Sequence, residues 1–142
     1  MKASARNQFV GTVSEVQIGA VNAEVVILLK GGETLVAAIT KDSIDALNIK
    51  TGIEVIALVK APQIIIVTDF GGFRVSARNQ LTGVVTQIKA GAVNTEIDIE
   101  LAGGQPIAAT VTNDSVETLG IRKGESVTAI FKAGAVILAV AI

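Results

Sequence analysis

The sequence matches itself when it is shifted by 72 positions, so that residues 1–70 align with residues 73–142 without a gap. Of the 70 aligned pairs, 28 are identical, and one identical stretch is the polar segment SARNQ at 4–8 and 76–80. Two copies are too few for a solenoid, whose stability needs several stacked repeats. The duplication therefore predicts two packed, similar domains, 1–70 and 73–142, with a seam at the segment FGGF, residues 70–73.

The first part of each repeat has the signals of β-strands. Residues 4–18 read as a strand, and Gly11 within them indicates a bend or a bulge. Residues 23–39 read as a hairpin whose arms are joined at Gly31-Gly32, because glycine tolerates the positive φ of a two-residue turn. In the second repeat, acidic and apolar residues alternate along 96–101, which is the period of a half-buried strand.

The second part of each repeat adds one short helix and two further strands. The segment TKDSIDALNIKTG begins with capping residues, places Ile44 and Leu47 on one face, and has Gly52 just beyond the helix. Residues 53–60 and 63–69 then read as two strands that close the same unit. Five strands and one short helix per repeat predict an all-β fold with one short helix per domain, built as two tandem OB-like barrels.

Composition excludes several kinds of function. The chain has no cysteine and no histidine, and its only aromatic residues are four phenylalanines, so thiolate chemistry and histidine catalysis are absent. Its net charge of −1 gives no long-range attraction for nucleic acids or anionic membranes. No apolar run is long enough to cross a bilayer, and the first residues lack the apolar core of a signal peptide. These features predict a soluble, cytoplasmic protein that does not bind membranes.

The apolar content predicts self-association. Half of the residues are hydrophobic, and the chain ends on the apolar segment AVILAVAI. A domain of about 70 residues leaves much of its surface uncovered. The surplus apolar area is therefore expected between domains and between chains, in an obligate homo-oligomer.

Four polar segments recur in both repeats, and each has a functional and a structural interpretation. SARNQ offers an arginine with hydroxyl and amide donors for an oxyanion, or simply the outward polar residues of a strand. The helix opening TxxS offers hydroxyls and unpaired N–H groups, or simple capping. The lysine of VKA is either a counter-charge for an anion or a surface side chain that snorkels to water. The segment GAVN is either an anion-binding nest or a plain turn.

Together these segments hold hydrogen-bond donors but no catalytic base. Burying a dianion is costly unless opposite charges and many donors replace its water. An arginine, a lysine, several hydroxyls and a helix end in each repeat meet that requirement, whereas histidine, cysteine and a repeated pair of close carboxylates are missing. The sequence therefore favours oxyanion binding, and the protein is not expected to be an enzyme.

The segments SARNQ, GAVNAEV, TKDSIDALNIKTG and VKAPQI, in this order, resemble the Mop domain of the molbindin family. The resemblance runs through both repeats and covers nearly the whole chain, which points to the tandem, di-Mop (ModG-type) form of the family. It implies OB-like Mop barrels in a ring of six domains, so that a two-domain chain would form a homotrimer. The implied ligand is molybdate, or alternatively tungstate, with no organic cofactor and no directly coordinated metal.

The resemblance also implies two classes of oxyanion-binding site. At interfaces between domains, the SARNQ segment of one domain would meet the helix opening and the lysine of its neighbour: Ser4, Arg6, Asn7, Thr40, Ser43, Lys60 and Ala61, with Ser76, Arg78, Asn79, Thr112, Ser115, Lys132 and Ala133 in the second repeat. Near the threefold axis, the turns would bind the anion largely through backbone groups: Ala20, Asn22, Ala92 and Asn94. Two replacements between the repeats, Pro62 by Gly134 and Lys41 by Asn113, lead us to expect unequal sites.

The leading functional hypothesis is intracellular storage or buffering of molybdate and tungstate, as part of molybdenum homeostasis. Sites made only of donors favour a fully deprotonated oxyanion, and molybdate and tungstate are expected to bind well above sulfate. The alternative is an OB-fold nucleic-acid-binding module, which would need a basic groove and stacking aromatic residues that this chain lacks. An enzyme that inserts molybdenum into a cofactor, and a molybdate-responsive regulator acting through another protein, rank lower.

Overall fold

The structure is a computed structural model that describes all of residues 1–142, and the two repeats contain the same elements in the same order. The first repeat contains β1 (Asn7–Ile18), β2 (Asn22–Leu29), β3 (Thr34–Thr40), α1 (Lys41–Leu47), β4 (Glu54–Val59), the 3-10 turn η1 (Ala61–Gln63) and β5 (Ile65–Val67). The second contains β6 (Asn79–Ala90), β7 (Asn94–Leu101), β8 (Pro106–Thr112), α2 (Asn113–Leu119), β9 (Ser126–Phe131), the 3-10 turn η2 (Ala133–Ala135) and β10 (Ile137–Ala139).

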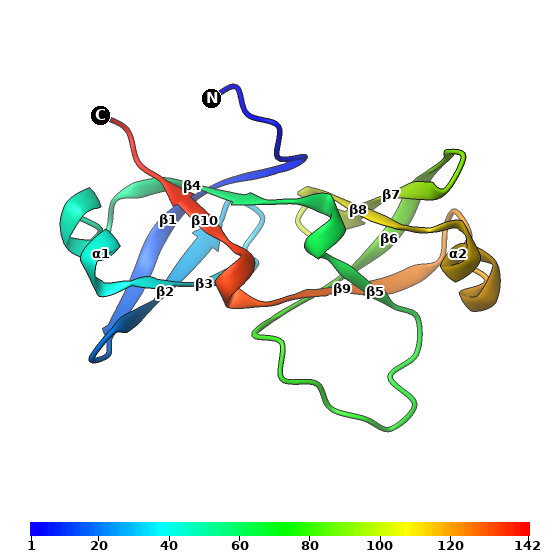
Figure 1. Cartoon of the computed structure of the whole chain (residues 1–142), viewed down its shortest axis with the longest axis horizontal. Helices are drawn as coiled ribbons and strands as arrows, with labels where there is room; N and C mark the ends of the chain where they lie inside the picture. Colours follow the sequence, from blue (N-terminus) through cyan, green and yellow to red (C-terminus); the bar gives the residue numbers. More distant parts are fainter.

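The strands form two five-stranded antiparallel sheets that lie side by side along the long axis of the molecule, with α1 and α2 at its opposite ends (Figure 1). The strand order is β10-β4-β1-β2-β3 in one sheet and β5-β9-β6-β7-β8 in the other. The expected fold class, all-β with one short helix per domain and two tandem OB-like barrels, is confirmed.

The fifth strand of each sheet comes from the other repeat. β5 pairs with β9, with Ile65 opposite Ile130, and β10 pairs with β4 in the same way. The expectation that residues 63–69 close their own unit is therefore wrong, because η1 carries the chain across to the second barrel, where it packs against β8. The ranges 1–70 and 73–142 thus describe the sequence repeats, and each barrel combines four strands of one repeat with one strand of the other.

Gly11 lies on β1 where the neighbouring strand passes too close for a side chain. A Cβ at this position would lie 2.6 Å from the carbonyl oxygen of Leu28 on β2. The bulge expected at Gly11 lies instead three residues further along, where the register of β1 against β2 shifts between Val13 and Glu15. The glycine is thus required by a close approach of two strands, and the bulge is a separate feature.

The hairpin loop between β2 and β3 uses its two glycines for different reasons. Gly32 has a left-handed φ of +95°, which favours glycine, but Gly31 does not. A Cβ on Gly31 would lie 2.8 Å from the Cα of Gly103, its equivalent in the second repeat. The hairpin loops of the two repeats therefore meet backbone to backbone, and the Gly103 N–H also donates a 2.8 Å hydrogen bond to Glu33 Oε2.

Both α-helices are seven residues long and have side-chain caps at their first turn. Thr40 Oγ1 accepts a 3.1 Å hydrogen bond from the Ser43 N–H, and Thr112 accepts the same bond from Ser115. At the end of α1, Asn48 adopts the left-handed conformation with a φ of 52°, which stops the helix before Gly52 is reached. The expected helix is therefore present and shorter than its sequence signal.

The barrel interiors are aliphatic, with one phenylalanine in each. Phe9 of β1 and Phe131 of β9 are 1% and 2% exposed. Their equivalents in the other repeat are Leu81 and Val59, so the largest side chain occupies a different position in each barrel. The core thus keeps its aliphatic character while the two repeats pack differently in detail. Neither short helix has the length and hydrophobicity needed to span a membrane.

Candidate functional site

The asparagines of the two SARNQ segments hold the two repeats together. Asn7 is 3% exposed, and its side-chain amide donates to the carbonyl of Ala108 at 2.8 Å and accepts from its N–H at 2.7 Å. Asn79 makes the same pair of bonds with Val36, both at 2.8 Å. Ala108 and Val36 lie on β8 and β3, the edge strands of the two sheets, so each amide takes the place of a missing strand.

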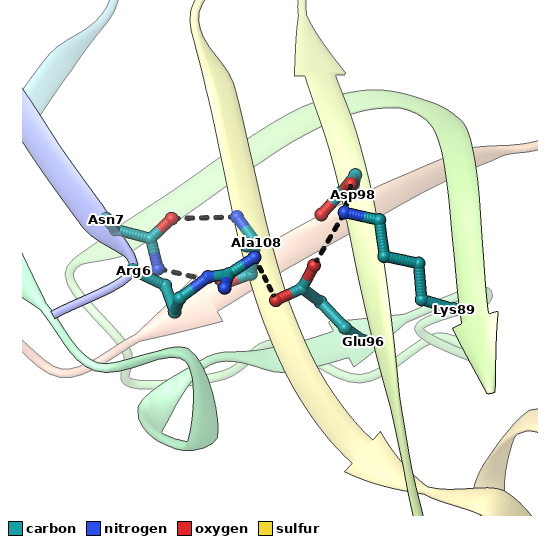
Figure 2. Close-up of polar contacts among 6 residues, drawn as sticks. All are labelled: Arg6, Asn7, Lys89, Glu96, Asp98 and Ala108. Atoms are coloured by element: carbon teal, nitrogen blue, oxygen red, sulfur yellow. Dashed lines mark hydrogen bonds and ion pairs between the residues drawn. The ribbon is translucent and has the colours of Figure 1, made fainter. Parts of the chain in front are cut away.

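The arginines of the same segments also reach across to the other repeat. Arg6 Nη2 lies 2.6 Å from Oε1 of Glu96 on β7. Figure 2 shows this ion pair as a dashed line. Arg78 Nη1 lies 2.7 Å from both carboxylate oxygens of Glu24 on β2. The two arginine side chains are 57% and 53% exposed, so both guanidinium groups remain accessible from solution.

Glu96 has a second cationic partner, Lys89 on β6 (Figure 2). Lys89 Nζ lies 3.3 Å from Oε2 of Glu96 and 3.4 Å from Oδ2 of Asp98. The hydrogen bond to Glu96, followed by the charge of Asp98, raises the pKa of Lys89 above its ordinary value. In the first repeat, Gln17 and Val26 stand at the positions of Lys89 and Asp98, so Glu24 has no second cation. The two arginines thus have equivalent glutamate partners, but the contacts differ in geometry and in their surroundings.

The lysines expected in the site lie with the serines of their own repeats. A groove of about 450 Å³ is lined by Ser4 and Lys60 on one side and by Gly134 of η2 on the other. An equivalent groove of about 430 Å³ is lined by Ser76 and Lys132 and by residues of η1. The strand exchange thus builds each groove from both repeats, with a hydroxyl and an ammonium group from one of them.

The alanines after the lysines are buried and do not line these grooves. Ala61 and Ala133 are 2% and 7% exposed, and neither has a side-chain donor. Pro62 lines the groove of the second repeat's lysine, whereas Gly134 lines that of the first. Because of the strand exchange, the replacement of proline by glycine in one repeat therefore changes the groove that holds the lysine of the other repeat.

At the helix openings the expected hydroxyls are bonded to each other. Thr40 Oγ1 lies 2.9 Å from Ser43 Oγ, and Thr112 Oγ1 lies 2.8 Å from Ser115 Oγ. This is the capping arrangement that was the structural interpretation of these residues. Both threonines are exposed, so their hydroxyls face solution.

The replacement of Lys41 by Asn113 changes the contacts of the second helix opening. Asn113 Oδ1 accepts a 2.6 Å hydrogen bond from Thr95 Oγ1, and its amide nitrogen donates to the carbonyl of Gly91 at 3.0 Å. The second repeat therefore ties its GAVN turn to its helix with a side chain, while the first repeat leaves a positive charge there.

The GAVN turn lies beside the helix opening of its own repeat. Asn22 pairs with Thr40 in the β2–β3 ladder, and the Lys41 N–H donates to the carbonyl of Val21 at 2.8 Å. The exposed turn residues therefore share one end of each barrel with the helix-opening hydroxyls: Ala20 and Asn22 in the first repeat, Ala92 and Asn94 in the second.

Within one barrel, the lysine and the helix opening lie at opposite ends of β1. Lys60 follows Val59, which pairs with Asn7 at the beginning of β1. Thr40 pairs with Asn22, which lies beyond the other end of β1. A site that combines this lysine with this helix opening is therefore not formed by a single barrel.

The chain instead brings the SARNQ segment of one repeat toward the helix opening of the other. Glu96, the partner of Arg6, is opposite Thr110 in the β7–β8 ladder, and the next pair on the same face is Asn94 with Thr112. Two residues of a strand span roughly 7 Å. Arg6 is thus held beside a residue that lies two positions along β7 from Asn94, the partner of Thr112 at the helix opening of the second barrel.

The sequence interpretation missed Glu24 and Glu96. The signal was present, because the same glutamate stands two positions after the GAVN asparagine in both repeats. A carboxylate repels an anion, so these glutamates do not fit the pattern of donors expected of an oxyanion site. Apart from such ion pairs, the acidic side chains form no group of three that could hold a metal ion.

Comparison with known proteins places this geometry in a family. The TOBE domain family matches residues 3–66 and 75–138, one domain in each repeat. The chain belongs to the TOBE domain family. The two TOBE domains include every expected site residue, and the expected resemblance to tandem Mop-type domains is confirmed.

One solved structure resembles both TOBE domains together. It is the crystal structure of the cytoplasmic molybdate-binding protein ModG with molybdate bound, which is 51% identical to this chain. The TM-score is 0.96, and the match covers 99% of this chain and 100% of that one. The likeness thus includes the relative placement of the two barrels.

Curated relatives match the same TOBE pair within longer proteins. Molybdenum transport protein ModE of Herbaspirillum seropedicae is 41% identical over 140 residues, and molybdenum-pterin-binding protein MopA of Rhodobacter capsulatus is 42% identical over 139. These alignments cover 99% and 98% of this chain. The chain spans about half, 52%, of the length of each relative.

Proposed function

We propose that this chain binds molybdate, with tungstate as an alternative ligand, and stores or buffers it in the cytoplasm. The observation that carries the proposal is the likeness of the whole chain, both barrels together, to a cytoplasmic molybdate-binding protein. The cationic and hydroxyl groups of the polar segments support it, because arginine, lysine and hydroxyl donors suit an oxyanion that carries no proton. The proposed role is binding rather than catalysis, because these segments hold no histidine, no cysteine and no pair of close carboxylates.

Two kinds of surface carry the proposed sites. The first is the pair of grooves with a serine and a lysine, Ser4 with Lys60 and Ser76 with Lys132. Each lysine is followed by a buried alanine, Ala61 or Ala133. The second is the helix-opening end of each barrel, which faces an arginine of the other repeat: Thr112, Ser115, Ala92 and Asn94 with Arg6, and Thr40, Ser43, Ala20 and Asn22 with Arg78. Asn7 and Asn79 act mainly by fixing the arginines beside them.

A homotrimer of six barrels would complete the sites. Because Lys60 and Thr40 lie at opposite ends of β1, a site that combines the lysine and the helix opening of the same repeat would take one of them from a second chain. Equivalent apolar side chains are exposed in both repeats, Val21 and Val93 at 72% and 71%, and Ile65 and Ile137 at 60% and 63%. Apolar surface of this kind favours contacts between chains.

The proposal is tested by calorimetric titration of the full chain with sodium molybdate, tungstate and sulfate, together with mass measurement under native conditions. We expect saturable binding of molybdate and tungstate, much weaker binding of sulfate, and the mass of three chains. Equal affinity for sulfate would remove the selectivity, and a monomer that binds nothing would remove the proposal.

A nucleic-acid-binding role is the alternative that an OB-like fold brings with it. Some TOBE-containing relatives are named transcriptional regulators, but this chain spans about half of their length. The net charge of −1 and the lack of tryptophan and tyrosine leave no basic, stacking surface. We therefore expect no retention on single-stranded DNA at low salt, and retention there would favour the alternative.

A further inference from the structure

The two arginines of the proposed oxyanion sites already form ion pairs with carboxylates. Glu24 places both of its oxygens 2.7 Å from Arg78 Nη1, and Glu96 places one 2.6 Å from Arg6 Nη2. Each glutamate therefore fills the position that an oxyanion would take on the guanidinium group. The same arrangement occurs in both halves of the molecule, although most aligned positions differ between the repeats.

In each pair, the arginine is the partner that is free to move. The side chains of Arg6 and Arg78 are 57% and 53% exposed, whereas those of Glu96 and Glu24 are 17% and 36% exposed. Glu96 and Glu24 belong to the internal strands β7 and β2, whereas the two arginines lie just before β1 and β6, respectively. A change of partner therefore requires only rotation of a long, exposed side chain.

Each arginine would move along the same face of the sheet, by two strand residues, toward the helix opening. Glu96 is followed on that face by Asn94, which pairs with Thr112, and Glu24 is followed by Asn22, which pairs with Thr40. That step is roughly 7 Å, within the sweep of an arginine side chain. The hydroxyls and turn N–H groups at that position can donate to an oxyanion, and the acidic groups of the first helical turns there are Asp42 and Asp114.

We propose that Glu24 and Glu96 compete internally with the oxyanion, each holding its arginine until the ligand reaches the helix-opening end of that barrel. The proposal rests on the proposed function and describes how those sites are regulated. No covalent bond changes; one carboxylate–guanidinium ion pair is exchanged for an oxyanion–guanidinium pair. Because the ligand must displace the glutamate, the affinity is lower than the donors alone would give, which suits uptake and release by a buffer.

Lys89 makes the two exchanges unequal. When Arg6 leaves Glu96, the carboxylate keeps Lys89 as a partner, 3.3 Å away. When Arg78 leaves Glu24, no second cation remains, because Gln17 stands at the position of Lys89. The release of Arg6 is therefore easier, and the site that uses Arg6 binds the oxyanion more tightly than the site that uses Arg78.

The test is calorimetric titration with sodium molybdate of the full chain and of the variants Glu24→Gln and Glu96→Gln, at one low ionic strength. Each variant should bind molybdate about two- to fivefold more tightly at one class of sites, the range expected when an exposed ion pair is removed. Glu100→Gln is the matched control, since Glu100 is exposed on the same strand as Glu96 and makes no ion pair. It should change the affinity by less than either variant.

The outcomes separate this inference from the proposed function. A wild-type chain that binds no molybdate overturns both. Wild-type binding with an affinity that Glu24→Gln and Glu96→Gln change no more than Glu100→Gln overturns the inference alone. Should a variant fold poorly in a thermal melt, the decision falls to a crystal structure of the wild-type protein with molybdate: Arg6 away from Glu96 supports the exchange, and Arg6 still bonded to it overturns the exchange.

Discussion

Asn7 and Ala108 are 101 residues apart in the sequence, yet the side-chain amide of one and the backbone of the other exchange two hydrogen bonds. An amide side chain has the same donor and acceptor as a peptide group, so it pairs with an edge strand as another strand would. Asn79 does the same for Val36. Each amide therefore satisfies one N–H and one carbonyl of an edge strand of the other repeat's sheet.

Replacing Asn79 by alanine should destabilise the protein. The buried N–H and carbonyl of Val36 would lose their partner, which costs about 1–3 kcal/mol of the free energy of unfolding. Urea denaturation followed by circular dichroism measures the change. Gln80→Ala is the control, because Gln80 is the exposed next residue and its loss should cost about 0.5 kcal/mol or less. Equal effects of the two variants would contradict the structural role of Asn79.

Replacing Gly103 by alanine should weaken the contact between the hairpin loops. The new Cβ would lie 2.4 Å from the Cα of Gly31 and 2.5 Å from its carbonyl oxygen, so backbone must move. Gly134→Ala makes the same chemical change where no atom lies within 4 Å. We expect a lower melting temperature for the first variant, and for the second no loss or a gain of about 0.4–1 kcal/mol. Similar melting temperatures would count against the loop contact.

Replacing Arg6 by alanine should reduce molybdate binding without breaking the assembly. A charge-assisted hydrogen bond contributes about 1.5–3 kcal/mol, so the affinity of the affected sites should fall about tenfold or more. Metal analysis of dialysed protein and native mass measurement check both parts. Arg74→Ala is the control, since Arg74 is exposed in the connection between β5 and β6 and makes no ion pair. Unchanged binding in Arg6→Ala would remove Arg6 from the site.

An isolated first repeat, residues 1–72, should not form a closed monomer. Its β4 would lack β10, and its β5 would have no β9 to pair with. Two copies can satisfy each other by exchanging β5, so we expect a dimer in sedimentation equilibrium or an unfolded chain when dilute. A stable, folded monomer would show that residues 63–69 can close their own barrel.

Lys89 should titrate above the ordinary value for lysine. Its pKa is raised first by the hydrogen bond to Glu96 and then by the charge of Asp98. Because the folded pKa lies above the unfolded one, the stabilisation is complete below about pH 10.4 and is lost as the pH rises through the folded pKa. An NMR titration of the Lys89 side chain should show this pKa falling toward the ordinary value in Glu96→Gln. No fall in that variant would mean that Glu96 is not the main cause.

The element types could be predicted from the sequence, but not the strand exchange. The pattern around Ile65 predicts a strand whichever partner it has. In the structure Ile65 lies opposite Ile130, and the equivalent Ile137 lies opposite Leu58, so pairing within a repeat would offer nearly the same neighbours. Local propensity therefore cannot choose between the two partners, and the choice depends on how the 3-10 turns cross between the barrels.

The candidate site shows the same limit. The donors of SARNQ could be recognised from their types, but their partners depend on which strand of the other barrel faces them. Asn7 meets an unpaired edge at Ala108, and Arg6 meets Glu96, which only the folded pair of repeats brings near. The two identical glutamates can be seen in the sequence, but their role cannot, because it depends on which arginine faces each of them in the fold.

Because β5 and β10 are exchanged between the two barrels, the segment that connects β5 to β6 is not needed to hold the barrels together. Proteolysis there, for instance after Arg74, would yield two polypeptides, each still inserted in the sheet of the other. Such a nicked molecule should elute as one particle and separate only under denaturing conditions. The covalent link at the seam therefore ensures that the two halves are made in equal amounts. The non-covalent pairing of the exchanged strands is what holds them together.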